Sequence, residues 1–159
     1  RGVPTSEAPR PLGATSLYFR ARGLPLRRPM LVLNGSEQGR VMHLANLAAV
    51  VPAYAPVGED LLTVTVAGAP DTPPEQLAAE VLDEVTPIIG AAVRTCSLLR
   101  VWRLPHALPF LAPQACWRAP APADSNGIVM TGDYTESPSI QGALRAGRRA
   151  AETILSGRI

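Results

Sequence analysis

The chain has 159 residues, of which 47% are hydrophobic, and this is enough for one domain with a substantial core. Its net charge is +2 and its basic residues, all of them arginine, are scattered, so nucleic-acid binding is not indicated. No apolar run approaches the roughly 18 residues of a membrane span, and no secretory leader is visible. Its two cysteines, Cys96 and Cys116, form neither a disulfide framework nor a zinc knuckle. We therefore expect a cytoplasmic protein with reduced thiols.

The first half of the chain predicts a series of short strands. Residues 1–14 are rich in proline and glycine and predict a linker or a frayed end. The segment TSLYFRA places Leu17 and Phe19 on one face of a strand, and further strands follow at 30–35 and 41–45. DLLTVTVAG alternates most clearly of all. Strands at this spacing, joined by short turns, favour an antiparallel sheet.

A helix is expected after these strands. In DTPPEQLAAEVLDEV, Thr72 precedes two prolines and Glu75 stands three residues further on, which is the pattern of a capping box. The helix should end before Pro87. Its apolar stripe consists of Leu77, Ala78, Val81, Leu82 and Val85. The segment SLLRVWRLPHALPF then predicts a strand that runs into a proline-broken segment.

The carboxyl-terminal stretch predicts a short apolar strand at 128–130, ending at Gly132 and Asp133, and then a helix. Ser137 can cap this helix, with Pro138 at its first position. The free N–H groups of such a helix start suit an anion or a polarised carbonyl, and Asp133 can accept from sugar hydroxyls. A packing helix with a solvated aspartate is the alternative. The face expected to be buried comprises Ile140, Ala143, Leu144, Gly147, Ala151, Ile154 and Leu155.

The residues GIVMTGDYTESPSIQGALRAGRRAAETIL, Gly127–Leu155, resemble the C-terminal FAD-contacting motif of the flavin-containing amine oxidase superfamily. This superfamily includes phytoene desaturase-like and protoporphyrinogen oxidase-like enzymes. Upstream, VWRLPHALPF resembles the strand and turn before that motif, and residues 16–85 resemble the later part of the substrate-binding domain. The resemblance implies FAD as the cofactor and hydride transfer to it from a small, apolar organic substrate.

The resemblance also implies roles for single residues. Asp133 would hold the ribityl and pyrophosphate side of FAD, and the amides of Ile140 and Gln141 would point at the N1 and C2-carbonyl edge of the flavin. Gly142 and Ala143 would keep the helix start thin beside the ring. Ser139 stands where amine oxidases carry a cage tyrosine. The cofactor-binding residues would thus be Gly132, Asp133, Ser139, Ile140, Gln141, Gly142 and Ala143.

Three features depart from the family pattern. The GxGxxG fingerprint that cradles the ADP half of FAD is missing, so a Rossmann half from elsewhere is expected as a partner, unless that half has been lost. No lysine is present, and Ser139 replaces the cage tyrosine. Both differences favour a desaturase- or dehydrogenase-like relative over an amine oxidase. No catalytic residue can be named in this chain. No metal site is expected either, because His43 and His106 lack a second ligand at metal-binding spacing.

We therefore expect an α+β fold. It would comprise part of an antiparallel substrate-domain sheet with a flanking helix, and a C-terminal strand-helix that completes an FAD-binding domain whose Rossmann start is absent. The expected boundaries are a linker at 1–14, a partial substrate-binding domain at 15–118 and an FAD-domain element at 119–159. The alternative is a non-catalytic fragment or subunit that keeps the fold and acts through self-association as a homo-oligomer.

Overall fold

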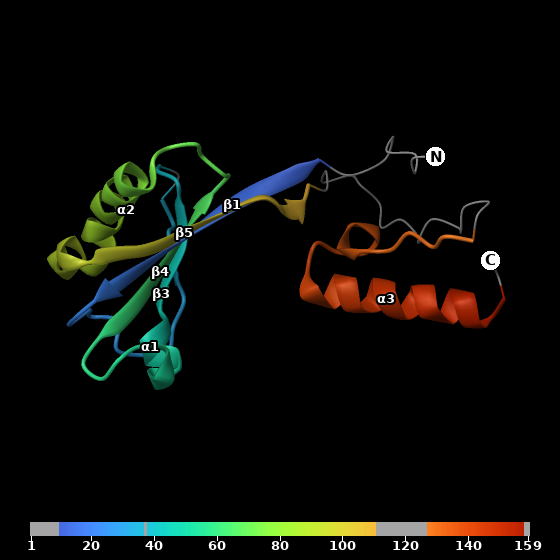
Figure 1. The fold of residues 1–159 in the computed structure, drawn as a ribbon, viewed down its shortest axis with the longest axis horizontal. Helices are drawn as coiled ribbons and strands as arrows, with labels where there is room; N and C mark the ends of the chain where they lie inside the picture. The colour runs from blue at the N-terminus through green and yellow to red at the C-terminus, as the bar shows by residue number, and fades with distance from the viewer. Residues whose placement is uncertain (1–9, 37, 111–126, 158–159) are drawn as a thin grey trace. The chain divides into compact units, whose positions relative to one another are not determined.

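The computed structural model falls into two units (Figure 1). The larger unit is Gly13–Pro105, and the smaller one combines Arg1–Leu12 with His106–Ile159. The larger unit contains both a sheet and helices, so the expected α+β class is confirmed. The expected boundary between residues 118 and 119 lies outside the described residues. Those residues are 10–36, 38–110 and 127–157.

The sheet has five strands in the order β2-β3-β4-β1-β5. The pairs β2–β3, β3–β4 and β4–β1 are antiparallel, as the alternating pattern predicted. Because β1 begins at Pro11, the end of the predicted linker belongs to a strand. The strands are β1 (Pro11–Ala21), β2 (Val32–Leu33), β3 (Val41–Asn46), β4 (Asp60–Ala67) and β5 (Ser97–Pro109).

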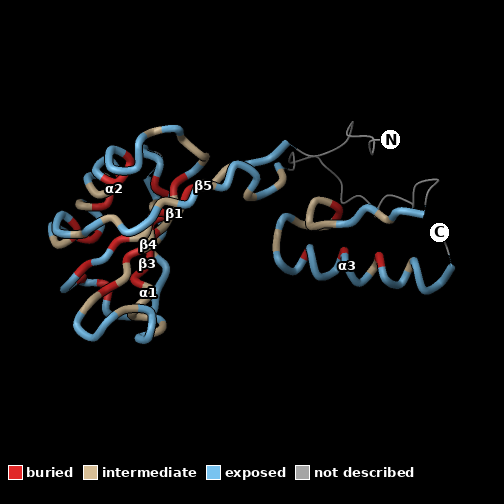
Figure 2. The backbone as a smooth tube through the Cα atoms, viewed as in Figure 1, coloured by how far each residue is buried: buried red, intermediate tan, exposed pale blue. Residues whose placement is uncertain are grey.

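One face of the sheet forms the core, and Figure 2 shows buried residues along the strands and on α2. Leu17 is paired in register with Val64 and Phe19 with Leu62, and all four side chains are fully buried. The helix α2 (Pro74–Ile89) packs on this face with Leu77, Val81 and Val85. Period-two burial on the strands and helical burial on α2 therefore meet in one apolar layer, as the sequence predicted.

Both predicted ends of α2 are wrong. The N-cap is Pro73, which has no side-chain cap bond, so the capping box at Thr72 and Glu75 does not form. The helix also continues through Pro87 to Ile89 and stops at Gly90, whose φ of 90° suits only glycine. Pro87 therefore stands in the last turn of α2, two residues before its end at Ile89.

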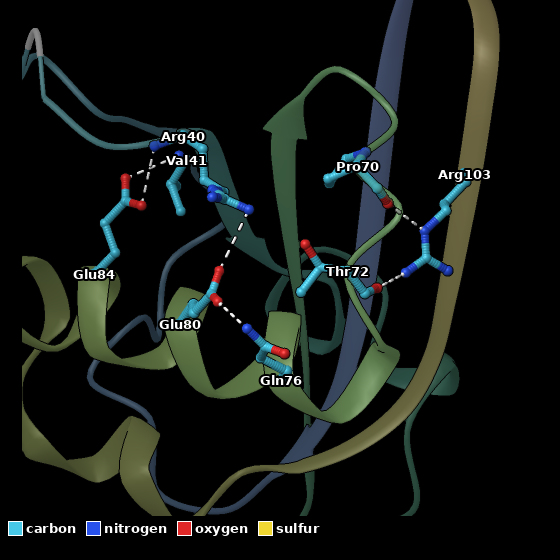
Figure 3. Close-up of polar contacts among 8 residues, drawn as sticks. All are labelled: Arg40, Val41, Pro70, Thr72, Gln76, Glu80, Glu84 and Arg103. Carbon is cyan, nitrogen blue, oxygen red and sulfur yellow. Dashed lines mark hydrogen bonds and ion pairs between the residues drawn. The ribbon is translucent and has the colours of Figure 1, made fainter.

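Long-range bonds hold the helix and the segment before it to the sheet (Figure 3). The Arg103 side chain on β5 donates from Nε to the Pro70 carbonyl at 2.8 Å and from Nη2 to the Thr72 carbonyl. Further along α2, Glu84 accepts from the amides of Arg40 (3.1 Å) and Val41 (2.8 Å). These bonds tie both ends of the helix to the sheet.

A buried polar pair holds the loop after β1. Asp60 is 8% exposed and accepts from the Leu24 amide at 3.0 Å and from Asn46 Nδ2 at 2.8 Å. Asn46 also donates to the Leu26 carbonyl at 3.1 Å and accepts from the Leu61 amide at 3.3 Å. Because every buried polar atom of this pair has a partner, the pair stabilises the fold.

The last strand is continuous, which corrects the predicted proline break. The Phe110 amide donates to the Arg10 carbonyl at 2.7 Å, so every second amide counted back from Phe110 faces β1. The nitrogens of Pro109 and Pro105 then fall on the outer edge of β5, which is the end strand of the sheet. Neither proline removes a ladder bond, and both discourage pairing with another chain at this edge.

The remaining short helices connect the strands of the larger unit. They are α1 (Leu47–Val50) and the 3-10 turns η1 (Pro52–Tyr54) and η2 (Ala91–Thr95). No helix in the described parts of the chain is long and apolar enough to cross a membrane.

Candidate functional site: a helix amino terminus and an open sheet face

The turn before the last helix is held by one residue that sequence reasoning missed. Thr135 is buried, and both its amide (3.0 Å) and its Oγ1 (2.7 Å) donate to the Gly132 carbonyl. This closes the 3-10 turn η3 (Asp133–Thr135). Residues 128–130 are not assigned to a strand, so the expected strand there is wrong. Asp133 is half-exposed at the start of η3, and its carboxylate has no partner among the described residues.

The last helix, α3 (Ile140–Leu155), begins two residues later than predicted. Its cap is Ser139, whose Oγ accepts from the Gly142 amide at 3.0 Å. Ser137, the predicted cap, instead shares a hydrogen bond with the Ser139 hydroxyl at 2.8 Å. Ser139 is extended, as an N-cap requires, and Pro138 precedes it outside the helix.

Two donors remain open at this terminus. The Gly142 amide is used by the cap and the Ala143 amide donates to the Ser139 carbonyl at 3.0 Å. The amides of Ile140 and Gln141 have no partner within the described residues. They stand at the positive end of a 16-residue helix, where anions and polarised carbonyls are stabilised.

A glycine at position 142 is required by the packing of the preceding turn on α3. A Cβ at this position would collide with the carbonyl oxygen of Ser137, which lies directly against the helix. The glycine therefore lets the turn pack on α3. Ala143, the next residue, is exposed. A role of these two residues beside a ring stays a prediction.

The helix buries the face opposite to the expected one (Figure 2). Its buried residues are Gly142, Ala146 and Ala150, which are small. Ala143 and Gly147 are exposed, and the expected apolar stripe faces outward in the described structure because the turn occupies the small-residue face. The exposed fractions on the stripe are 78% for Ile140, 70% for Leu144, 52% for Ile154 and 87% for Leu155.

An ion pair fixes the turn to the helix. The half-buried Arg149 donates to Glu136, whose side chain is only 14% exposed. Sequence analysis gave no signal for this pair, because the two residues are far apart in sequence and lie on different elements. By contrast, Arg148 pairs with Glu152 in the exposed i,i+4 manner typical of a solvated helix face.

The larger unit offers a second surface, here called the open face: the face of the sheet opposite α2. Arg20 and Leu61 are cross-strand partners on this face, as are Tyr18 and Thr63. On β5, the Arg100 guanidinium lies 4.7 Å from the centre of the Trp102 ring, and Trp102 is 52% exposed. The open face thus presents aromatic, hydroxyl and guanidinium groups together. Its residues on β1 and β4 are Ser16, Tyr18, Arg20, Leu61, Thr63 and Thr65.

The one described cysteine is not a nucleophile at neutral pH. Cys96 packs against the core as a free thiol. Burial, and secondarily the negative charge of Asp60, raise the pKa of the Cys96 thiol to about 11. The thiolate is therefore scarce at pH 7. Cys116 lies outside the described residues.

Among known proteins, a solved structure is similar to this chain and a family model matches it. Among solved structures, the crystal structure of the PF1083 protein from Pyrococcus furiosus is similar, with a TM-score of 0.56 and 14% identity. The match covers 89% of this chain and 31% of that chain, so this chain spans about a third of that relative's length. At this identity the likeness concerns the fold alone. A comparison with curated proteins found no match.

The family model described as flavin containing amine oxidoreductase matches residues 17–155. The matched range runs from the first core residue of β1 to the last residue of α3, so it spans both units. The resemblance drawn from the carboxyl-terminal motif is confirmed. Because the model covers far more than half of the residues, this chain belongs to the flavin-containing amine oxidoreductase family.

Proposed function

We propose that this chain supplies the substrate-domain sheet and the flavin-contacting helix of an FAD-dependent oxidoreductase. The observation that carries the proposal is the open pair of donors, Ile140 and Gln141, at the positive end of α3. Two adjacent N–H groups match the electron-rich pyrimidine edge of an isoalloxazine, and the helix dipole favours the negative charge of its reduced form. Bound there, FAD would supply a hydride acceptor for a substrate carbon.

The side chains around this terminus fit a flavin nucleotide. The Asp133 carboxylate has no partner in the described chain, and a carboxylate at this point can accept from ribityl hydroxyls. Ser139 is engaged in capping the helix through Gly142, so its hydroxyl serves to hold the terminus in place. The cofactor contacts would therefore come from the Asp133 side chain and from backbone amides.

The exposed stripe on α3 supports a partner domain. Ile140, Leu144 and Leu155 are each at least 70% exposed, and large apolar side chains gathered on one helix face mark a contact surface. The solved relative has about two thirds of its length outside the match. We assign the stripe to a nucleotide-binding domain that holds the ADP half of FAD. A second copy of this chain is the less favoured occupant of the stripe, because self-association would leave the ADP half of FAD without a binding site.

The open face of the sheet would contact the substrate. It carries Tyr18 and Trp102, which suit an organic molecule with apolar surface, and Thr63 and Thr65, which can orient it by hydrogen bonds. This chain has no lysine, so it does not supply the lysine that amine oxidases use beside the flavin. A desaturase- or dehydrogenase-like reaction is the form of the proposal that these residues support.

The flavin content of the intact protein tests this proposal. Asp133→Ala should lower the ratio of bound FAD to protein, because a ribityl hydroxyl loses its acceptor. The matched control is Asp71→Ala, which removes an exposed carboxylate from the larger unit and should leave the ratio unchanged. An intact protein that stays colourless after incubation with FAD overturns the proposal. Equal flavin content in both variants removes Asp133 from the site.

A further inference from the structure

The larger unit has a hollow at one end of the open face that the proposed flavin contacts do not use. It has a volume of about 520 Å³, and its apolar wall includes Tyr54, Leu61 and Leu99. Tyr54 and Leu99 are 60% and 55% exposed, so the wall is open to solvent. Arg20, the cross-strand neighbour of Leu61, stands at its edge beside Glu59.

The acidic and basic side chains around the hollow differ in their exposure to solvent. The Glu59 side chain is only 9% exposed and accepts from the guanidinium of Arg20 and, at 2.7 Å, from that of Arg22. The two arginine side chains are 53% and 72% exposed. The neighbouring Asp60 is buried, and its oxygens are taken by Asn46 and the Leu24 amide. The carboxylates therefore face inward, while the guanidinium groups face solvent.

Arginine chemistry leaves donors for a ligand. A guanidinium carries five N–H groups, and Arg20 uses only its Nη2 toward Glu59. The hydrogen bonds from Arg20 and then Arg22 lower the pKa of Glu59, and the same contact raises the pKa of Arg20. These two shifts favour the charged forms of Glu59 and Arg20 at neutral pH. Three charged residues line the hollow, Arg20, Glu59 and Asp60, and Arg20 is the cation among them, next to the apolar wall; Arg22 pairs with Glu59 but does not line the hollow.

We propose that this hollow binds an organic anion, with its apolar body against Leu61, Leu99 and Tyr54 and its carboxylate on the free N–H groups of Arg20. This names the substrate class for the open face, so it rests on the proposed function. A planar carboxylate matches the fork of a guanidinium, which is why arginine discriminates such groups from neutral and cationic ones. The competing explanation is that Arg20 and Arg22 only fasten the segment before β4 to β1.

Three probes of the same shape test the proposal on the intact protein: phenylbutyrate, phenylbutanol and phenylbutylamine. Calorimetry should show phenylbutyrate binding about fivefold more tightly than the alcohol, as expected for one charge-assisted hydrogen bond partly screened by solvent. The amine should bind most weakly. Equal affinities for the three probes, or no binding of any of them, would overturn the proposal.

Two variants locate the preference. Arg20→Gln should abolish the advantage of phenylbutyrate over phenylbutanol, and Glu59→Gln should increase it, because both guanidinium groups are released. Arg94→Gln is the matched control, since Arg94 forms an exposed pair with Asp83 at 3.6 Å and does not line the hollow. A preference that survives Arg20→Gln, or that falls equally in the control, refutes the assignment. The Glu59→Gln result decides the matter if Arg20→Gln fails to fold.

The flavin content of the same preparations separates this inference from the proposed function. Protein that carries FAD but shows no carboxylate preference refutes the anion site and leaves the flavin proposal standing. Protein without FAD that still prefers phenylbutyrate refutes the flavin proposal and keeps the anion site.

Discussion

Replacing Ile140 with proline removes one backbone N–H from the start of α3 and changes little else in the helix. Ile140 is the first helical residue, and proline is favoured there because its fixed φ suits the helix and its missing donor is not needed. Ser139 has φ −157° and ψ 162°, the extended conformation that a residue before proline prefers. The Ile140 amide has no partner within the described residues, so the variant loses no hydrogen bond among them.

The size of the effect follows from what that amide would contact. A hydrogen bond to a charged group contributes about 1.5–3 kcal/mol, and one between neutral groups about 0.5–1.5 kcal/mol. The amide would therefore stabilise the anionic reduced flavin more than the neutral oxidised one, by about 1 kcal/mol or somewhat more. For a two-electron couple, about 1.4 kcal/mol corresponds to about 30 mV. We expect Ile140→Pro to lower the flavin potential by about 20–40 mV.

Redox titration of the intact protein measures this shift. Ile140→Ala is the matched control, because it shortens the same side chain and keeps the amide. Any effect of a smaller side chain on the stripe appears in both variants, so the control should keep a potential about 20–40 mV above that of Ile140→Pro. If both variants show the same potential, the Ile140 amide does not face the flavin and the geometry of the proposed site is wrong.

Three further predictions concern the fold. Gly142→Ala should destabilise the protein by about 1–3 kcal/mol in urea unfolding, because the new methyl group meets the Ser137 carbonyl, although alanine is otherwise the better helix former. Asn46→Ala should cost about 2–4 kcal/mol in the same assay, since it leaves several buried polar groups without partners. In a Cys116→Ser background, alkylation of Cys96 by iodoacetamide should keep accelerating up to about pH 11, instead of levelling near 9.0.

Each of these three predictions would be contradicted by a specific outcome. A Gly142→Ala protein more stable than its parent would show that the turn at Ser137 does not lie against the helix. Thr95→Ala removes a hydroxyl whose bond to Ala92 is exposed, so it should cost less than about 0.5 kcal/mol. A comparable loss in Thr95→Ala and Asn46→Ala would contradict the role assigned to burial. A plateau in the alkylation rate near pH 9 would mean that Cys96 is accessible to solvent.

Period-two and helical patterns predicted the elements whose partners lie within this chain. The alternation in β1 placed Leu17 and Phe19 correctly, because the strand buries one face under α2 and leaves the other open. The stripe on α2 was correct for the same reason. In each case one face of the element is buried, and the regular spacing of its apolar residues predicts the local structure.

The wrong predictions concern positions where contacts with residues distant in sequence determine the local structure. Arg103 binds the Thr72 carbonyl, and the amides of Arg40 and Val41, at the start of β3, bind the Glu84 carboxylate. Neither contact leaves a local pattern in the sequence. The prolines of β5 read as breakers, although an edge strand accepts them when their nitrogens face outward. The choice of Ser139 over Ser137 as the cap depends on how the turn packs on Gly142.

The helix α3 shows why part of the site could not be derived at all. Its small residues Gly142, Ala146 and Ala150 are buried within the described chain, while its larger apolar residues are exposed. The sequence pattern assigned the burial to the larger side chains, which is the expected preference when a helix has one buried face. A helix with small residues on one side and large apolar residues on the other is suited to packing on both.

That two-sided packing also bears on the electrostatics of the terminus. In bulk water the field of a helix end is strongly screened, and its effect on a charge is small. Covering the stripe at Ile140 and Leu144 would exclude water from the same end of α3 where the two open amides stand. The partner domain would then do more than hold the other half of a nucleotide, because it would lower the dielectric around the donors. On this reasoning, the Ile140→Pro shift depends on the intact protein, and a stripe variant such as Leu144→Glu should reduce both flavin retention and the shift.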